Sequence, residues 1–133
     1  MGDLITDSMA YAVTKEGEWT GASIAFQVPG GVRASLESGN VIYADLITTT
    51  PFERKLISFE IPGFAIRQAM EYSVSELDFL HVLQVSGIKT TYNLSRDSYD
   101  RVIELKALCQ LCDIPKYEDV DDAKFIVLLL RIS

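Results

Sequence analysis

Two segments of the chain place apolar residues at the three- and four-residue spacing of an amphipathic helix. The first runs from Leu4 to Val13, and Asp3 is positioned to cap the free amides of its first turn. The second begins at Pro62, and Arg67 and Glu71 stand four positions apart on its polar side, which predicts an exposed ion pair. Its apolar face consists of Phe64, Ile66, Ala69, Met70 and Val74.

Strands are predicted where apolar residues alternate with polar ones, or where they form short continuous runs between turn residues. The segment Asn40–Thr50 instead predicts a turn followed by a short helix or an irregular stretch. Phe125–Leu130 is the longest apolar run, which predicts a buried central strand. The predicted strands are Ala22–Gln27, Lys55–Ile61, Leu80–Val85, Ile88–Leu94, Arg101–Leu108 and Phe125–Leu130, the fourth and fifth forming a hairpin.

Composition adds limits on the class of protein. The chain has 133 residues, 48% of them hydrophobic and 23% charged, which predicts one compact domain with a real core. Its net charge of −7 makes nucleic acid a poor partner, because phosphate backbones require many lysines and arginines, and it also disfavours anionic membrane surfaces. The longest apolar run is too short for a membrane span, and the opening residues lack the pattern of a secretory signal.

Cys109 and Cys112 have C-x-x-C spacing, for which three interpretations remain open. A redox pair is disfavoured, because that motif belongs at the start of a helix after a strand, whereas Asp113, Ile114 and Pro115 follow it here. A disulfide that closes a small loop is favoured and implies an extracellular compartment. Two buried free thiols are the third interpretation.

Residues typical of catalysis or metal binding are few. His81 lies in an apolar run without a neighbouring cysteine or carboxylate cluster, so a hydrogen-bonded structural role is favoured. One histidine and two cysteines do not suffice for a zinc site built from those ligands alone. The sequence therefore predicts no catalytic residue and no metal ligand in this chain. An acidic cluster lacks the spacing of a calcium loop and is expected to be a solvated connector: Glu118, Asp119, Asp121 and Asp122.

One loop and one aromatic residue remain as candidates for ligand binding. Gly30 and Gly31 follow a predicted strand, and positive φ angles at these glycines would let the loop present amides and Arg33 to an anion. Phe52, next to Pro51, offers a ring for stacking. From these residues alone, an ordinary turn and a core phenylalanine are the competing interpretation.

Several short motifs, taken in order along the chain, resemble the C-terminal domain of the 5'-nucleotidase and apyrase family. They are Met1–Met9, Gly30–Arg33, Pro51–Phe52, Gly63–Ser73, Leu83–Ile88 and Arg101–Val102. A further group is similar to the animal ecto-5'-nucleotidase branch, in which this close cysteine pair is disulfide-bonded: Leu108, Cys109, Cys112, Pro115 and Tyr117. The resemblance covers nearly the whole chain.

The resemblance implies an α+β fold, with a mixed β-sheet and helices packed on it. It implies that residues 1–133 are a nucleotide-binding domain, whereas a separate N-terminal metallophosphoesterase domain holds zinc-type divalent metal ions and the catalytic histidine. Arg33 is expected to bind phosphate or ribose oxygens of an AMP- or ADP-like nucleotide, Phe52 to stack on its base, and Gly30 and Gly31 to form the adjoining loop. The parent protein is expected to be secreted or at the cell surface, and this chain alone to be inactive.

The sequence also departs from the family pattern. Val28 and Pro29 stand where the family has an asparagine and a glycine, and Glu53 replaces a glycine after the Pro-Phe pair. The family continues past the last strand into a second stacking aromatic, and Met1 matches an internal methionine, so we expect a domain that is incomplete at both ends. The alternative function is a non-catalytic extracellular nucleotide binder or a divergent remnant without a ligand. Apolar surface meant to face missing sequence predicts self-association.

Overall fold

The computed structural model describes residues 1–15, 22–76, 82–109 and 112–132. Within these ranges no helix combines the length and the apolar character that crossing a membrane requires. The helices are α1 (Gly2–Lys15), α2 (Tyr43–Thr49) and α3 (Gly63–Ser73), with a 3₁₀ turn η1 at Pro29–Gly31. The strands are β1 (Ile24–Gln27), β2 (Lys55–Pro62), β3 (Gln84–Ser86), β4 (Ile88–Tyr92), β5 (Val102–Leu108), β6 (Tyr117–Asp119) and β7 (Phe125–Ile132).

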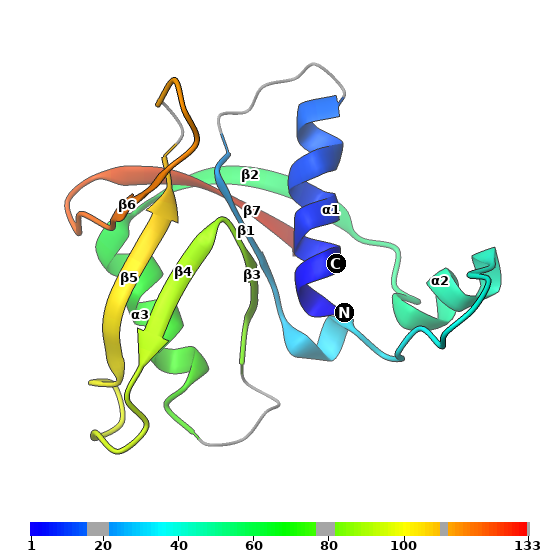
Figure 1. The fold of residues 1–133 in the computed structure, drawn as a ribbon, viewed down its shortest axis with the longest axis horizontal. Coiled ribbons are helices and arrows are strands. Elements are labelled where there is room, and N and C mark those ends of the chain that lie inside the picture. Colours follow the sequence, from blue (N-terminus) through cyan, green and yellow to red (C-terminus); the bar gives the residue numbers. More distant parts are fainter. Residues whose placement is uncertain (16–21, 77–81, 110–111, 133) are drawn as a thin grey trace.

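The strands form two sheets (Figure 1). The larger sheet has the order β2-β7-β1-β3; β7 runs parallel to β1 and antiparallel to β2, and β3 runs antiparallel to β1. The smaller sheet, β4-β5-β6, is antiparallel. A mixed sheet with packed helices confirms the predicted α+β class, and the interior position of β7 confirms that Phe125–Leu130 forms a central strand.

Two hydrophobic clusters cover opposite faces of the larger sheet, because successive strand residues point to opposite sides. On one face, Ala25 and Leu129 pack against Ile5 and Met9 of α1. On the other face, the sheet packs against α3 and the smaller sheet through a larger cluster: Ile24, Phe26, Ile66, Met70, Ile88, Leu105, Ala107, Val120 and Leu128. The layer order is therefore α1, the larger sheet, then α3 with the smaller sheet.

The first predicted helix is confirmed and is longer than predicted. α1 covers Gly2–Lys15, and Ile5 and Met9 lie one turn apart on its buried face. Asp3 lies inside the first helical turn instead of preceding it. Thr6 is fully buried. Its hydroxyl is still satisfied, because it donates to the backbone oxygens of Gly2 and Asp3 at 3.3 and 3.0 Å.

The second predicted helix is confirmed as α3, but two details are wrong. Ile66, Met70 and Val74 are buried as predicted, whereas the side chain of Phe64 is 49% exposed. Phe64 stands in the first turn, beyond the edge of the larger cluster. The predicted ion pair between Arg67 and Glu71 does not form. The Arg67 Nε instead donates to a carboxylate oxygen of Asp122, at 3.1 Å.

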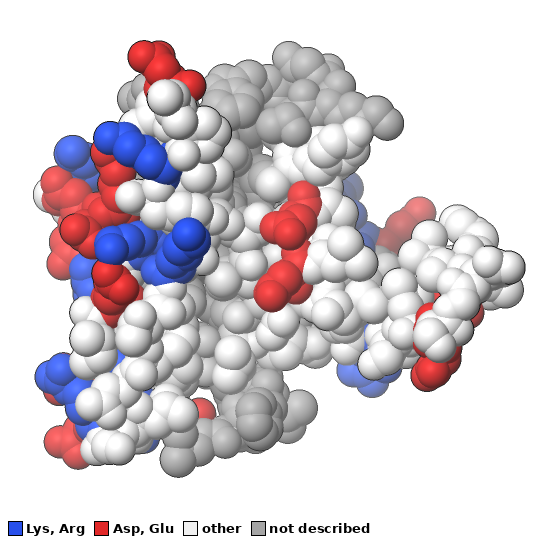
Figure 2. Space-filling view, viewed as in Figure 1, with Lys and Arg blue, Asp and Glu red and all other residues white. Residues whose placement is uncertain are grey.

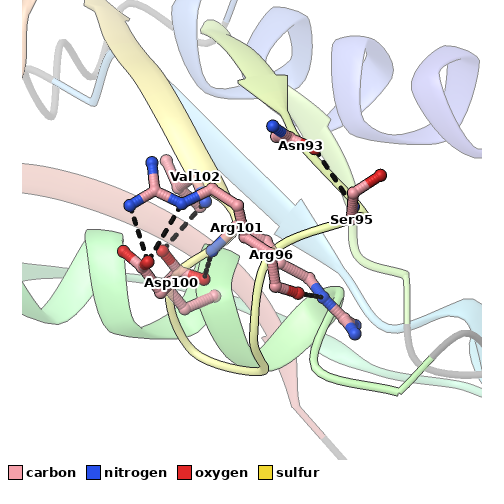
Figure 3. A network of polar contacts seen from close by, with 7 residues as sticks. Asn93, Ser95, Arg96, Asp100, Arg101 and Val102 are labelled. Atoms are coloured by element: carbon pink, nitrogen blue, oxygen red, sulfur yellow. Dashed lines mark hydrogen bonds and ion pairs between the residues drawn. The ribbon is translucent and has the colours of Figure 1, made fainter.

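Glu71, the other half of that predicted pair, instead joins α3 to β5. Its two carboxylate oxygens accept the backbone N–H groups of Arg101 and Val102, each at 2.9 Å (Figure 3). The Arg101 guanidinium in turn donates to the backbone oxygens of Val74 and Ser75, just after α3. A side chain of α3 thus binds the backbone at the start of β5, and the side chain of Arg101 binds the backbone after α3.

The turn between β4 and β5 is closed by its own polar contacts (Figure 3). The Arg96 guanidinium binds one carboxylate oxygen of Asp100 through Nε and Nη2, at 2.9 and 2.6 Å. The Ser95 N–H donates to the Asn93 side-chain oxygen at 3.0 Å, and the Asn93 N–H donates to the Arg101 backbone oxygen at 2.8 Å. The predicted hairpin with a polar turn is confirmed.

β3 begins later than the predicted strand Leu80–Val85, and His81 lies outside the described residues. Gly87 then carries the chain from the larger sheet into the smaller one. Its φ is +71°, and a Cβ at this position would lie 1.9 Å from the backbone oxygen of Ser23. The transition between the sheets therefore depends on glycine.

Candidate functional site

The loop after β1 has a different shape from the one predicted. Neither Gly30 nor Gly31 has a positive φ; among the described glycines, that conformation occurs at Gly39 and Gly87. The loop is instead a 3₁₀ turn that begins at Pro29, whose fixed φ suits the first position of a helix. The prediction of positive φ angles at the glycine pair is wrong.

Hydrogen bonds inside this turn also occupy one of the amides that was expected to face an anion. The Gly31 N–H donates to the Val28 backbone oxygen at 3.0 Å. Gly31 is buried beneath the Gln27 side chain, whereas Gly30 is exposed with open space where a Cβ would be. Of the two glycines, only Gly30 has room for direct ligand contact.

Arg33 extends from the end of this loop and is anchored through its backbone. Its N–H donates to the backbone oxygen of Thr49, the last residue of α2, at 2.8 Å. The side chain is exposed, and no carboxylate pairs with it in the described part of the chain. The guanidinium is therefore fixed at its base and open to a ligand.

Phe52 lies on the short connection from α2 to β2. Its side chain is 43% exposed, so the interpretation of a core phenylalanine is wrong. The Arg54 guanidinium lies over the Phe52 ring, 5.0 Å from the ring centre, and Arg131 of β7 donates to the Phe52 backbone oxygen at 3.4 Å. One face of the ring is covered by a cation, which leaves the other face for stacking.

A cleft of about 300 Å³ adjoins Phe52, between α1 and α2. Leu4 and Ile5 of α1 line one side, and Leu46 of α2 lines the other. Arg131 also lines the cleft, and its bond to the Phe52 backbone places Phe52 beside it. The candidate site therefore consists of an apolar cleft, an accessible Phe52 ring, the exposed Arg33 side chain and the partly buried Arg131.

Cys109 and Cys112 form a disulfide, with their Cα atoms 5.7 Å apart. The Cys109 N–H donates to the Lys116 backbone oxygen at 2.8 Å, so the bridge lies within the turn between β5 and β6. The Glu118 carboxylate lies within 4.8 Å of the two sulfur atoms. Because the sulfurs are bonded to each other, this group offers no thiolate to a metal ion.

The family profile described as "5'-nucleotidase, C-terminal domain" matches residues 1–128. The chain belongs to this family. It is similar to a 5'-nucleotidase-related protein of Glossina morsitans morsitans (37% identity, 93% of this chain and 24% of the relative), and to an apyrase of Tabanus yao (36%, 91% and 23%). A snake venom 5'-nucleotidase of Gloydius brevicauda is 33% identical over 98% of this chain and 24% of its own length.

The crystal structure of a 5'-nucleotidase precursor from Thermus thermophilus has the same fold, with a TM-score of 0.83 and 28% identity. The alignment covers 98% of this chain and 24% of that chain. The chain therefore spans about a quarter of the length of the relatives that it matches. The chain is therefore similar, over nearly its whole length, to the C-terminal domain of 5'-nucleotidases and apyrases.

Sequence reasoning missed three residues that surround Phe52 and the glycine loop. Arg54 and Gln27 both lie over Gly31, and Arg131 reaches Phe52 from the end of β7. Burial, and secondarily the nearby charge of Arg54, lowers the pKa of Arg131. One signal was available in the sequence, because Arg131 interrupts the most apolar run of the chain.

Proposed function

We propose that this chain is the nucleotide-binding part of a 5'-nucleotidase-type hydrolase. Arg33 contacts phosphate or ribose oxygens, Phe52 stacks on the base through its uncovered face, and the exposed Gly30 allows a close approach. The proposal rests on two observations in a member of this family: the Arg33 side chain is exposed without a carboxylate partner in the described chain, and the Phe52 ring is exposed. A guanidinium fork suits phosphate oxygens, and an aromatic ring suits any base.

Hydrolysis belongs, in this proposal, to the metal-binding N-terminal domain of the family, so the 133-residue chain releases no phosphate by itself. The proposed ligands are AMP- or ADP-like nucleotides. We also propose that the parent protein acts outside the cell, because its disulfide persists in oxidising compartments and one relative is named as a venom protein.

The second candidate is a non-catalytic nucleotide binder or a remnant without a ligand. It is favoured by the changes at the binding loop, where Val28 offers no polar side chain and Pro29 lacks an N–H. Arg54 also covers one face of Phe52, where a base would otherwise have access. Measurement of nucleotide binding separates the remnant without a ligand from the first candidate.

The test is calorimetric titration of the 133-residue chain with AMP, ADP and adenosine. We expect Arg33→Ala to weaken AMP binding by about tenfold or more, through the loss of charge-assisted hydrogen bonds. We expect Phe52→Ala to weaken adenosine binding by about tenfold, in line with the usual contribution of base stacking. Lys116→Ala is the matched control, since Lys116 pairs with Glu118 in the smaller sheet.

A phosphate-release assay with added zinc or magnesium completes the test. No turnover is expected from the chain alone. Turnover that Arg33→Ala abolishes would contradict the assignment of hydrolysis to another domain, and absence of binding at millimolar nucleotide would leave only the remnant.

A further inference from the structure

The cations of the described chain fall into two groups, those that bind a carboxylate and those that do not. Arg101 donates to backbone oxygens, and Lys89 lies over the ring of Tyr117. Five others bind carboxylates: Arg67, Arg96, Lys106, Lys116 and Lys124. Figure 2 shows part of this pairing, with blue and red atoms intermingled over the smaller sheet. Besides Lys89 and Arg101, the cations with described side chains that have no carboxylate partner are Arg33, Arg54, Lys55 and Arg131.

Backbone alternation places two of these on one face of the larger sheet. Arg131 is two residues beyond Leu129, which packs under α1, and it pairs in register with Leu56. Arg54 is two residues before Leu56, which packs in the same cluster, so Arg54 and Arg131 share that face. Lys55, the residue between Arg54 and Leu56, is directed to the opposite face.

Arg54 has a buried donor without an acceptor. Its Nε is inaccessible to solvent and has no hydrogen-bond partner among the described residues. A Cβ built on Gly31 would lie 3.5 Å from the Arg54 Nη1, so the guanidinium lies against the glycine loop. A buried charged donor without an acceptor is costly, so the described chain leaves the positive charge of Arg54 only partly compensated.

Arg131 and Arg54 both contact Phe52, Arg131 at its backbone oxygen and Arg54 over its ring, and the described chain supplies no carboxylate to either of them. Its one described hydrogen bond is the contact of 3.4 Å to the Phe52 backbone oxygen, which is longer than the usual N–H···O distance. Two neighbouring guanidinium groups without a counter-ion, in a chain of net charge −7, form a site for an external anion.

We propose that Arg54 and Arg131 bind a second phosphate group, next to the one that Arg33 contacts, so that the site prefers nucleoside diphosphates or longer polyphosphates to monophosphates. This inference rests on the proposed nucleotide-binding function. Three guanidinium groups match a ligand with about three negative charges, whereas a single terminal phosphate carries about two. Arg54 lies between the proposed sites for the base and for the phosphates, because it contacts both the Phe52 ring and the glycine loop.

The experiment titrates ADP, AMP and inorganic pyrophosphate into the 133-residue chain and into Arg54→Gln and Arg131→Gln, with the melting temperature of each protein followed in parallel. We expect each substitution to weaken ADP and pyrophosphate binding by about tenfold or more, and AMP binding by less. Lys55→Gln is the control, since it removes the adjacent charge on the opposite face and should leave all three affinities unchanged.

The outcomes separate this inference from the proposed function. If Arg33→Ala weakens AMP binding while both glutamine variants hold ADP like the unmodified chain, nucleotide binding stands and the second phosphate site is wrong. A lower melting temperature with unchanged ADP affinity would assign Arg54 to a structural contact with Gln27 and also overturn the inference. Binding of pyrophosphate that depends on Arg54 and Arg131, without binding of AMP or adenosine, would retain the anion pair and refute the nucleotide site.

Discussion

Gly30 and Gly87 differ in what their missing side chains permit. Gly87 has a φ of +71°, and a Cβ there would lie 1.9 Å from the Ser23 backbone oxygen. Gly30 has no positive φ, and nothing lies within 4 Å of a Cβ built on it. The fold requires a glycine at position 87, whereas Gly30 is free to contact a ligand.

We therefore expect opposite results from the two alanine substitutions. Gly87→Ala should lower the free energy of unfolding by about 3 kcal/mol or more, because it adds backbone strain to a clash with backbone atoms. Gly30→Ala should change that free energy by no more than about 0.5 kcal/mol, yet weaken AMP binding if the ligand approaches the loop backbone as proposed. Urea denaturation and calorimetry measure the two effects, and equal stability losses would contradict the assignment of Gly87.

The sequence predicted a ligand-binding role for the glycine pair and Phe52, which stays a prediction, but it did not predict how these residues are placed. The exposure of Phe52 follows from the path of the chain after α2, and the position of Arg54 over its ring is a tertiary contact. Arg131 was visible as a charge in an apolar strand, but its partner in register, Leu56, comes from β2, far earlier in the chain. Side-chain partners at such separation do not follow from local pattern.

At the scale of elements, Glu71 connects α3 to the β4–β5 hairpin. Two backbone N–H groups at the start of β5 bind its two carboxylate oxygens, each at 2.9 Å. Glutamine has the same shape but replaces one acceptor oxygen with a donor. One of the two amides then loses its partner.

We expect Glu71→Gln to lower the free energy of unfolding by about 2 kcal/mol, the usual value of a hydrogen bond to a charged group. Glu37→Gln is the control, since Glu37 is exposed and its substitution removes the same charge. Chemical denaturation measures stability, and hydrogen exchange at the Arg101 or the Val102 amide should accelerate in Glu71→Gln but not in Glu37→Gln. Equal stability of the two variants would show that Glu71 does not hold the hairpin.

Most helices and strands were predictable because they follow local periodicity, which burial on one face imposes. α1, β2, β5 and β7 all include their predicted segments within a residue or two. The predicted pair of Arg67 with Glu71 failed for the complementary reason. Both side chains have partners from distant segments, and those contacts prevail over an exposed i,i+4 pair, which contributes only about 0.3–0.5 kcal/mol.

At the scale of the whole molecule, α2 stands apart from the layered body. Figure 1 shows that extended segments connect it to the rest of the molecule, away from both sheets, and Figure 2 shows mostly white surface there with groups of red atoms at its edges. Five apolar residues of α2 and of the two positions before it are about half exposed or more: Val41, Ile42, Tyr43, Leu46 and Ile47. Exposed apolar patches of this kind promote association. We therefore propose that copies of the 133-residue chain associate through α2.

The substitutions Leu46→Lys and Ile47→Lys, made together, test this proposal. They place two like charges on the exposed side of α2, so association through that helix should be lost. Light scattering over a range of protein concentrations measures the average mass, which should rise with concentration for the unmodified chain and stay at that of one copy for the variant. The control carries Leu94→Lys and Ile114→Lys, which add the same charges to exposed apolar residues elsewhere. Association that survives the α2 substitutions, or that the control abolishes equally, would assign it to another surface. Loss in the α2 variant alone would identify this helix as the surface that two copies share.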